Sequence, residues 1–220
     1  MMFDAIVVGG SYAGQSAAMQ LARARRSILV IDGGNRRNRF AEASHGFLTQ
    51  DGRSPSAIAA ASRAQLLAYP TVEWIDGEAR SASRTVDGFE VTTTGDARYM
   101  GRRMVLATGV VDRLPKIPGL VERWGRSVFH CPYCHGYELN RGRIGVLAVS
   151  PLSMHHALLV PEWGPTTFFT NGTFVPDDEQ QAQLDRRGVT VERAPIDRID
   201  GESADVVLKD GRVVSLAGLF

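Results

Sequence analysis

The first 32 residues combine two apolar runs with a glycine-rich turn and an amphipathic stretch. Residues 3–8 are apolar and predict a buried strand, and residues 15–26 place small and apolar side chains on one face, which predicts a helix. Residues 27–31 predict a second buried strand that ends at Asp32. Gly9 and Gly14 take the first and last positions of a G-x-G-x-x-G turn, with Ser11 at the middle glycine. The pattern predicts a strand–turn–helix–strand unit.

The middle of the chain predicts one helix and a group of short strands. Residues 56–68 are alanine-rich and predict a helix. Glycine-containing turns at 87–88 and 95–96 separate apolar runs that favour strands. The strands are predicted over residues 72–75, 78–82, 89–94 and 98–106. We expect them to form a small antiparallel insert within an otherwise parallel fold.

A second α/β unit is predicted from residue 143 onwards. A strand over 143–149, a helix over 152–160 and a strand over 166–170 open it. A further helix over 180–187 is followed by strands, predicted over residues 189–192, 196–199, 204–209 and 213–216. Residues 218–220 lie inside an apolar run and predict a strand at the end of the given chain.

Composition and charge narrow the classes of protein. The 220 residues are 44% apolar and carry a formal net charge of +1, which gives no electrostatic reason to expect nucleic acid or an anionic membrane as partner. No apolar run approaches a transmembrane length, and the first is too short for a signal peptide. We therefore expect a cytoplasmic protein, where a pair of nearby cysteines is more often catalytic or metal-binding than structural.

The only two cysteines, Cys131 and Cys134, form a C-x-x-C pair flanked by His130 and His135. Four interpretations are open. In the first interpretation the pair is a redox dithiol, because a neighbouring histidine favours the reactive thiolate. Alternatively it supplies two zinc ligands, or attaches a c-type haem through C-x-x-C-H, or consists of two buried structural thiols.

Several residues outside this pair indicate a dinucleotide site. Asp32 follows Gly14 by eighteen residues, the position at which an acid binds a ribose hydroxyl. A strand that ends in Ala107-Thr108-Gly109 lets the backbone approach a bound dinucleotide a second time. Loop 33–52 contains Asn38 among arginines, which either bind phosphate or ribityl oxygens or form a solvated basic loop, and the stretch from His45 to Phe47 is apolar enough to pack under a ring.

The second α/β unit lacks the glycines of a dinucleotide turn. Ala148, Ser150 and Ser153 stand where glycines are expected, and Pro151 removes one backbone N–H. No arginine cluster follows Thr170 to hold a 2′-phosphate. The helix N-terminus still attracts an anion, so the sequence predicts weakened rather than abolished NADPH binding.

Together these motifs resemble a known family. The glycine turn at 9–14, Ala107-Thr108-Gly109, Pro118-Gly119 and the C-x-x-C pair match the low-molecular-weight thioredoxin reductases, of the two-domain FAD/NAD(P) disulfide oxidoreductase class. The resemblance covers the whole chain. It implies an α/β fold with two Rossmann-like, three-layer β/β/α nucleotide-binding domains, over 1–117 and 118–220. It also implies a C-terminal segment that returns to the first domain, which we expect this chain to lack, so that FAD is retained weakly.

The resemblance assigns roles to individual residues. Cys134 would lie near the flavin C4a atom, Cys131 would attack the substrate disulfide, and His135 would carry protons. His135 and residues 136–138 look closer to the gliotoxin-type dithiol oxidases. The residues implied to contact FAD are Gly9, Ser11, Tyr12, Ala13, Gly14, Asp32, Gly33, Asn38, His45, Ala79, Thr108 and Gly109.

The expected function is that of an FAD-dependent thiol–disulfide oxidoreductase. Electrons would pass between a dithiol or disulfide substrate, the Cys131/Cys134 pair and flavin, with NADPH use in doubt. One alternative is an NADPH-independent dithiol oxidase that uses oxygen, and another is a non-catalytic flavin- or zinc-binding fold. The implied partner is a thioredoxin-like protein or a small dithiol or disulfide, in a homodimer when the protein is full length, with no metal site.

Overall fold

The computed structural model describes residues 1–220, which form two compact units. The first unit contains Met1–Arg39 and Arg53–Val111, and the second contains Phe40–Gly52 and Asp112–Phe220. The sequence did not indicate that Phe40–Gly52 belongs with the second half of the chain. The assignment of nucleotide-binding domains with a boundary after residue 117 stays a prediction.

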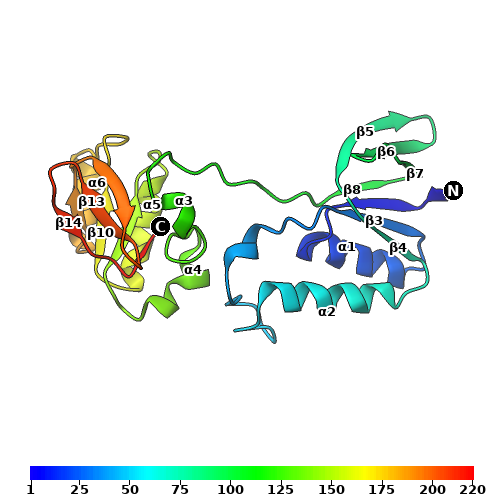
Figure 1. Ribbon diagram of the computed structural model, residues 1–220, viewed down its shortest axis with the longest axis horizontal. Helices are drawn as coiled ribbons and strands as arrows, with labels where there is room; N and C mark the ends of the chain where they lie inside the picture. The colour runs from blue at the N-terminus through cyan, green and yellow to red at the C-terminus, as the bar shows by residue number, and fades with distance from the viewer. The chain divides into compact units, whose positions relative to one another are not determined.

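The first unit has a parallel sheet at its centre, with strand order β4-β3-β2-β8. Its strands are β2 (Ala5–Val8), β3 (Ile28–Asp32), β4 (Val72–Asp76) and β8 (Met104–Leu106). Two helices, α1 (Tyr12–Arg23) and α2 (Pro55–Leu67), lie on one face of this sheet (Figure 1). A smaller sheet in the order β1-β7-β6-β5 lies on the other face. Its strands are β1 (Met2–Phe3), β5 (Ala79–Thr85), β6 (Gly88–Thr93) and β7 (Arg98–Gly101).

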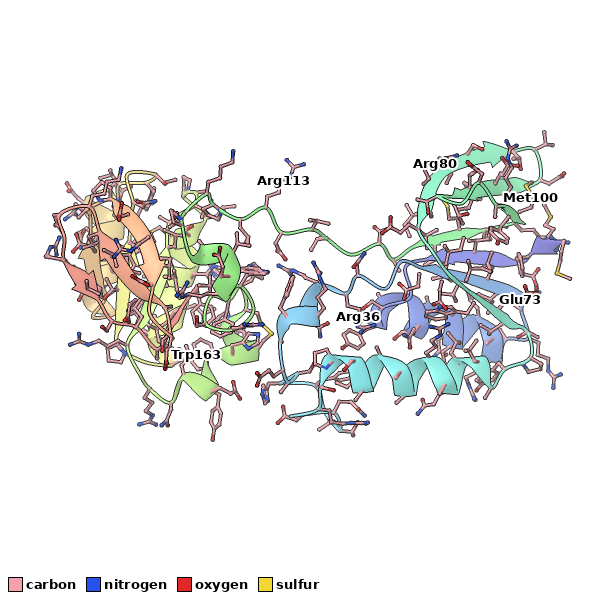
Figure 2. The ribbon with its side chains drawn as sticks, viewed as in Figure 1. Arg36, Glu73, Arg80, Met100, Arg113 and Trp163 are labelled. Carbon is pink, nitrogen blue, oxygen red and sulfur yellow. A yellow bond between two sulfur atoms is a disulfide. The ribbon has the colours of Figure 1, made fainter.

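Strand periodicity explains these three layers. Successive side chains of a strand point to opposite faces, so one strand supplies two cores. Val7 and Val30 pack in the core that includes Leu66 of α2, whereas Ile6 and Leu29 pack in the core of the smaller sheet. Figure 2 labels Arg80 and Met100 on that sheet. The predicted three-layer β/β/α arrangement is therefore confirmed for this unit.

One predicted strand is wrong. Residues 98–106 were expected to form a single strand, but they form β7 in the smaller sheet and β8 in the central sheet. Gly101 lies against the side chain of Ile6 at the change of sheet, where a Cβ atom would come within 2.7 Å of Ile6 Cγ1. The missing side chain lets the chain pass close to β2 as it moves from one sheet to the other.

The first helix also differs from its predicted bounds. It starts at Tyr12 rather than residue 15, so the last residues of the glycine turn already belong to the helix. It ends at Arg23, before Arg25, whose backbone has a left-handed φ of 58°. An L-residue in that conformation cannot continue a right-handed helix.

The second unit repeats the layered arrangement. A parallel sheet in the order β11-β10-β9-β15 contains β9 (Ile144–Leu147), β10 (Thr166–Phe169), β11 (Thr190–Glu192) and β15 (Gly218–Leu219). An antiparallel sheet contains β12 (Ile196–Asp200), β13 (Asp205–Leu208) and β14 (Val213–Val214). The longer helices are α5 (Ser153–Leu159) and α6 (Asp178–Arg186). Short helical turns complete it: α3 (Leu120–Arg123), α4 (Pro132–His135), η2 (Tyr137–Leu139) and η3 (Val160–Glu162), with η1 (Arg37–Phe40) at the border of the units.

Two cores again separate the layers. Phe168 and Val146 pack with Ala157 of α5, whereas Phe169 and Leu147 pack among the residues of the antiparallel sheet. The strand predicted at 218–220 is confirmed as β15, which pairs with β9. None of the helices combines the length and the hydrophobicity needed to span a membrane.

Candidate active site

The glycine turn after β2 is shaped by two close backbone approaches. Gly9 has a left-handed φ of 101°, and a Cβ atom there would overlap the carbonyl group of Ala107. A Cβ atom on Gly14 would overlap the carbonyl oxygen of Gly9. The two glycines therefore let α1 start directly against the end of β2 and beside the Ala107-Thr108-Gly109 segment.

Asp32 ties the end of β3 to this turn. Its Oδ1 atom accepts a hydrogen bond from the Gly10 N–H at 3.0 Å. Ser11, which precedes α1, makes no capping hydrogen bond with its side chain. The first N–H groups of a helix have no intrahelical acceptor, so the start of α1 offers donors and a positive dipole end to an anion.

The other predicted cofactor residues of the first unit lie around the same turn. Asn38 donates through Nδ2 to the hydroxyl of Tyr12 at 3.2 Å, which joins η1 to the start of α1. A Cβ atom on Gly33 would lie 2.8 Å from Cγ of Glu78, the residue before Ala79 at the start of β5. Ala13, Thr108 and Gly109 are exposed. Their roles in cofactor binding stay predictions.

The predicted role of His45 in cofactor binding also stays a prediction. His45 lies in Phe40–Gly52, the segment that packs in the second unit. Its Nδ1 atom is 3.5 Å from Oε1 of Glu138 and 3.6 Å from Oδ1 of Asp51. The structure therefore places His45 beside the C-x-x-C turn of its own unit, a placement that the sequence did not indicate.

The C-x-x-C pair lies on a single turn of helix. Cys131 precedes α4 and Cys134 lies within it; the two sulfur atoms form a disulfide, with Cα atoms 5.3 Å apart. The Cys134 N–H donates to the Cys131 carbonyl at 3.2 Å. Both cysteines are half-buried, so a substrate sulfur can reach the pair. Pro132 opens the helix, a position where its missing N–H leaves no helical hydrogen bond unmade.

Packing fixes the two ends of this turn. The Phe129 N–H donates to the Leu219 carbonyl at 2.8 Å, which attaches the approach to Cys131 to β15. On the other side, Gly136 lies against the indole of Trp163, and Tyr133 meets the same ring edge-on at 5.1 Å. The turn is therefore held between β15, in the parallel sheet of the second unit, and the side chain of Trp163, which Figure 2 labels.

His135 lies on Phe129, with ring centroids 4.2 Å apart and an interplanar angle of 18°. Burial lowers the pKa of His135 below its ordinary value of 6.5; the nearby Glu138 opposes this shift and His45 adds to it. The imidazole is therefore mostly neutral near pH 7, the form that accepts a proton from a thiol. His135 follows Cys134 directly on the same turn of helix.

The turn between β9 and α5 uses its own serines as hydrogen-bond acceptors. Ser153 Oγ accepts from the N–H of Val149 at 3.0 Å and from the N–H of Ser150 at 3.4 Å. Ser150 Oγ accepts from the N–H of Leu152 at 3.3 Å. These are the backbone donors that would otherwise face a pyrophosphate at this place in a Rossmann unit. The position after β10 is also occupied, because Asn171 Oδ1 accepts from the Ile196 N–H at 2.8 Å.

The comparisons with known proteins place the chain. Residues 3–149 match the family model described as pyridine nucleotide-disulphide oxidoreductase. The chain belongs to the pyridine nucleotide-disulphide oxidoreductase family. This membership confirms the resemblance inferred from the motifs.

Individual relatives within this family are thioredoxin reductases. Thioredoxin reductase tcpT of Claviceps purpurea is 40% identical over 68% of this chain and 47% of its own length. Thioredoxin reductase aclD of Aspergillus oryzae is 37% identical over 83% of this chain and 60% of its own length. The crystal structure of an oxidoreductase from Agrobacterium tumefaciens is 57% identical, with a TM-score of 0.96, over all of this chain and 74% of that one. The chain thus spans about half the length of the curated relatives it matches.

Membership in the pyridine nucleotide-disulphide oxidoreductase family implies flavin and nicotinamide cofactors in general. The first unit fits a dinucleotide, because Asp32 lies at the end of β3 and the start of α1 is not capped by Ser11. The second unit fits a dinucleotide less well, because the hydroxyls of Ser150 and Ser153 already accept hydrogen bonds from the N–H groups of its turn. No three histidine, cysteine, aspartate or glutamate side chains come together as a metal-binding group among residues 1–220.

Sequence reasoning missed two aromatic residues that position the redox pair. Phe129 could have been suspected, because it is an apolar residue two positions before Cys131. Trp163 lies 29 positions after Cys134, and no local pattern links them. Its role follows only from the tertiary packing of Gly136 and Tyr133 against its ring.

Proposed function

We propose that the chain provides the redox site of an FAD-dependent thiol–disulfide oxidoreductase. The observation that carries the proposal is the Cys131–Cys134 disulfide on a half-buried turn, with His135 beside it. When bound, FAD would supply two-electron redox chemistry between the reduced cysteines and a further acceptor. The residues of this chain would bind the cofactor in the first unit and exchange the disulfide in the second.

The proposed thiol–disulfide exchange uses three side chains. A substrate thiol gives its proton to His135, and the resulting thiolate attacks Cys131. The Cys131–Cys134 bond breaks, Cys134 leaves and takes a proton from His135, and a mixed disulfide forms. The second substrate thiol then gives its proton to the neutral His135, and its thiolate displaces Cys131, which takes that proton; the substrate is thus oxidised to a disulfide and the protein pair is reduced to two thiols.

We further propose that a dithiol, rather than NADPH, is the efficient electron donor. The supporting observation is the turn between β9 and α5, where the hydroxyls of Ser150 and Ser153 accept hydrogen bonds from three backbone N–H groups. A pyrophosphate would have to displace these acceptors, and α5 itself is only seven residues long. A dithiol oxidase that passes its electrons to oxygen is the function consistent with this turn, and it yields hydrogen peroxide from oxygen, two electrons and two protons.

The proposed partner is a small dithiol or a thioredoxin-like protein. Tyr133 lies between the two cysteines and Tyr137 follows the redox turn, and 69% and 85% of their surfaces are exposed. These two rings would be the first side chains that an approaching substrate meets. In the full-length protein we propose a homodimer located in the cytoplasm.

Anaerobic stopped-flow measurements on the full-length protein test this function. The purified protein is expected to be yellow, and its flavin absorbance is expected to bleach quickly with dithiothreitol and slowly with NADPH. Faster bleaching by NADPH would overturn the proposed donor and leave an ordinary NADPH-dependent reductase. A colourless protein that takes up no added FAD, or a flavin that neither donor reduces, would overturn the whole proposal.

A further inference from the structure

The second unit contains a cavity of about 200 Å³ next to the redox turn that carries Cys131 and Cys134. Its lining includes Phe129 and His130, the two residues directly before Cys131. The ring of Phe129 also stacks on His135, with centroids 4.2 Å apart. Every residue that lines the cavity belongs to the second unit. A ligand in this cavity would therefore contact the residues that lead into the redox turn.

The cavity lies where the order of the parallel strands reverses. In the sheet β11-β10-β9-β15, the strands β10 and β11 lie on one side of β9, and β15 lies on the other. Open α/β sheets bind ligands outside the carboxyl ends of their strands at such a switch point. Val149 follows the end of β9 and Phe220 follows the end of β15, and both line the cavity. The cavity thus occupies the position at which the topology favours a ligand.

The size and the lining of the cavity indicate a compact apolar ligand. Most of the lining side chains are apolar, among them Leu120, Trp124, Val128, Val146, Leu147 and Leu219. An apolar cavity of about 150 Å³ is known to hold benzene. Pockets for drug-sized ligands measure about 300–1,000 Å³. A cavity of about 200 Å³ therefore has room for one substituted ring and not for a whole dinucleotide.

The charges around the cavity favour a neutral ligand. Apart from two histidines, the lining contains one acidic and one basic side chain, Asp112 and Arg113. Burial lowers the pKa of His156 below 6.5, so this ring is mostly neutral near pH 7, and its Nε2 atom lies 3.2 Å from the His130 carbonyl oxygen. An ion that leaves water for an apolar cavity needs a matching charge, and the lining has no excess charge of either sign.

Ser153 supplies the cavity with a buried hydrogen-bond donor. The residue lines the cavity and is 7% exposed. Its Oγ atom accepts hydrogen bonds from the N–H groups of Val149 and Ser150, at 3.0 and 3.4 Å. A hydroxyl group has two acceptor lone pairs and one hydrogen, and no group among residues 1–220 accepts a hydrogen bond from this hydrogen. Because an unpaired buried donor is unfavourable, the hydroxyl is suited to a ligand oxygen.

We propose that this cavity is a binding site for a compact, neutral and mostly apolar molecule with a carbonyl oxygen, which accepts a hydrogen bond from the Ser153 hydroxyl. The apolar body of the ligand would contact Trp124 and Phe129. The phosphates of a pyridine nucleotide would meet neither the space nor the charge that they need. The inference concerns binding alone, so it does not depend on the proposed electron transfer.

Fluorine NMR with two matched probes tests the site in the full-length protein as purified. The first probe, 4-fluoroacetophenone, has a carbonyl oxygen, and the second, 1-ethyl-4-fluorobenzene, has nearly the same shape without that oxygen. Line widths over a protein titration give both dissociation constants. Because only the ketone accepts a hydrogen bond from Ser153, it should bind at least about threefold more tightly.

Two observations locate the bound probe. Val149→Trp adds bulk to a lining side chain that is 56% exposed, and it should weaken binding of the ketone by at least about tenfold. The matched control is Val213→Trp on β14, which is 57% exposed, does not line the cavity and should not change binding. In the unmodified protein the ketone should shift the indole N–H resonance of Trp124 and not that of Trp163, which lies outside the lining. This second observation needs no variant, so it holds even if Val149→Trp does not fold.

Several outcomes would overturn the inference. They are the absence of saturable binding, equal affinity for the two probes, an unshifted Trp124 resonance, and equal effects of the two tryptophan variants. Displacement of the ketone by NADPH would assign the cavity to the nucleotide and also overturn it. Failure of the proposed function is distinguishable: a protein that oxidises no dithiol but binds the ketone beside Trp124 loses the function and keeps the site, whereas one that oxidises dithiols without binding the ketone loses the site alone.

Discussion

Gly136 is the position at which the smallest change should damage the redox site most. Its backbone conformation, with φ of −66° and ψ of −32°, is ordinary right-handed helix, so alanine meets no conformational strain there. Helix propensity alone would favour Gly136→Ala by about 1 kcal/mol. The surroundings oppose this gain, because the alanine Cβ would lie 2.6 Å from the Pro132 carbonyl oxygen and 2.7 Å from two atoms of the Trp163 indole.

The size of the required movement sets the expected effect. Ordinary contacts of a Cβ atom begin near 3.4 Å, so Pro132 and Trp163 must each retreat by about 0.7 Å. Overpacking of this kind costs about 1–3 kcal/mol, which leaves a net loss of about 1 kcal/mol in the free energy of unfolding after the helix propensity is subtracted. The Pro132 carbonyl is also the acceptor of the Gly136 N–H at 2.7 Å, so the movement passes directly into the turn that holds Cys131 and Cys134.

We therefore expect Gly136→Ala to lower dithiol turnover by about tenfold or more while the flavin content stays unchanged, because displacements of about 1 Å cost up to about 100-fold in rate. Stopped-flow bleaching measures the rate, and urea unfolding measures the stability. The control is Gly95→Ala, since no atom lies within 4 Å of its added Cβ and its φ is not left-handed. In a Trp163→Leu background the alanine should be better tolerated. An unchanged rate in Gly136→Ala would refute the reasoning.

Two further predictions concern the thiols and the half-buried histidines. Cys131→Ser and Cys134→Ser should each abolish disulfide exchange while the flavin is retained. Cys134→Ser should perturb the visible spectrum of the flavin more than Cys131→Ser does. An equal loss of bound zinc from both variants, with the redox chemistry intact, would contradict this prediction. Burial lowers the pKa of His135 and His156 below 6.5, so the unfolded chain binds protons more readily and the free energy of unfolding should fall as the pH drops below about 6.5. Urea midpoints at about pH 7.5 and about pH 5.5 measure this loss, which should be smaller in a His135→Gln/His156→Gln variant; an equal loss would contradict the assignment.

The sequence predicted the parts of the fold that depend on local patterns. The turn from Gly9 to Gly14 follows from residue spacing, because a glycine is required wherever two backbones touch. The strands next to it follow from continuous apolar runs, since the central sheet is covered on both faces. The division of residues 98–106 between two sheets was not predictable, because both strands are apolar enough and the change of sheet depends on the contact of Gly101 with Ile6.

The candidate site was predictable in its chemistry and not in its tertiary contacts. Cys131, Cys134 and His135 are neighbours in sequence, so their spacing alone indicated a redox turn. His45 is separated from Glu138 by more than ninety positions, and only the packing of the segment Phe40–Gly52 brings the two side chains to 3.5 Å. The prediction that the stretch from His45 to Phe47 packs under a ring stays a prediction, and the nearness of its histidine to two carboxylates was not predicted.

Serine has opposite consequences at the turns that precede α1 and α5. Ser11 leaves the start of α1 uncapped, so the donors of that helix remain available to an anion. Ser153 accepts two N–H groups of its turn and Ser150 accepts a third, so the corresponding donors in the second unit are already satisfied. A pyrophosphate gains little by replacing hydrogen bonds that the protein already makes, because only the difference between the two sets of bonds contributes to binding. We therefore expect the first unit to bind a dinucleotide better than the second, and this expectation supports the proposal that electrons enter through the Cys131/Cys134 pair.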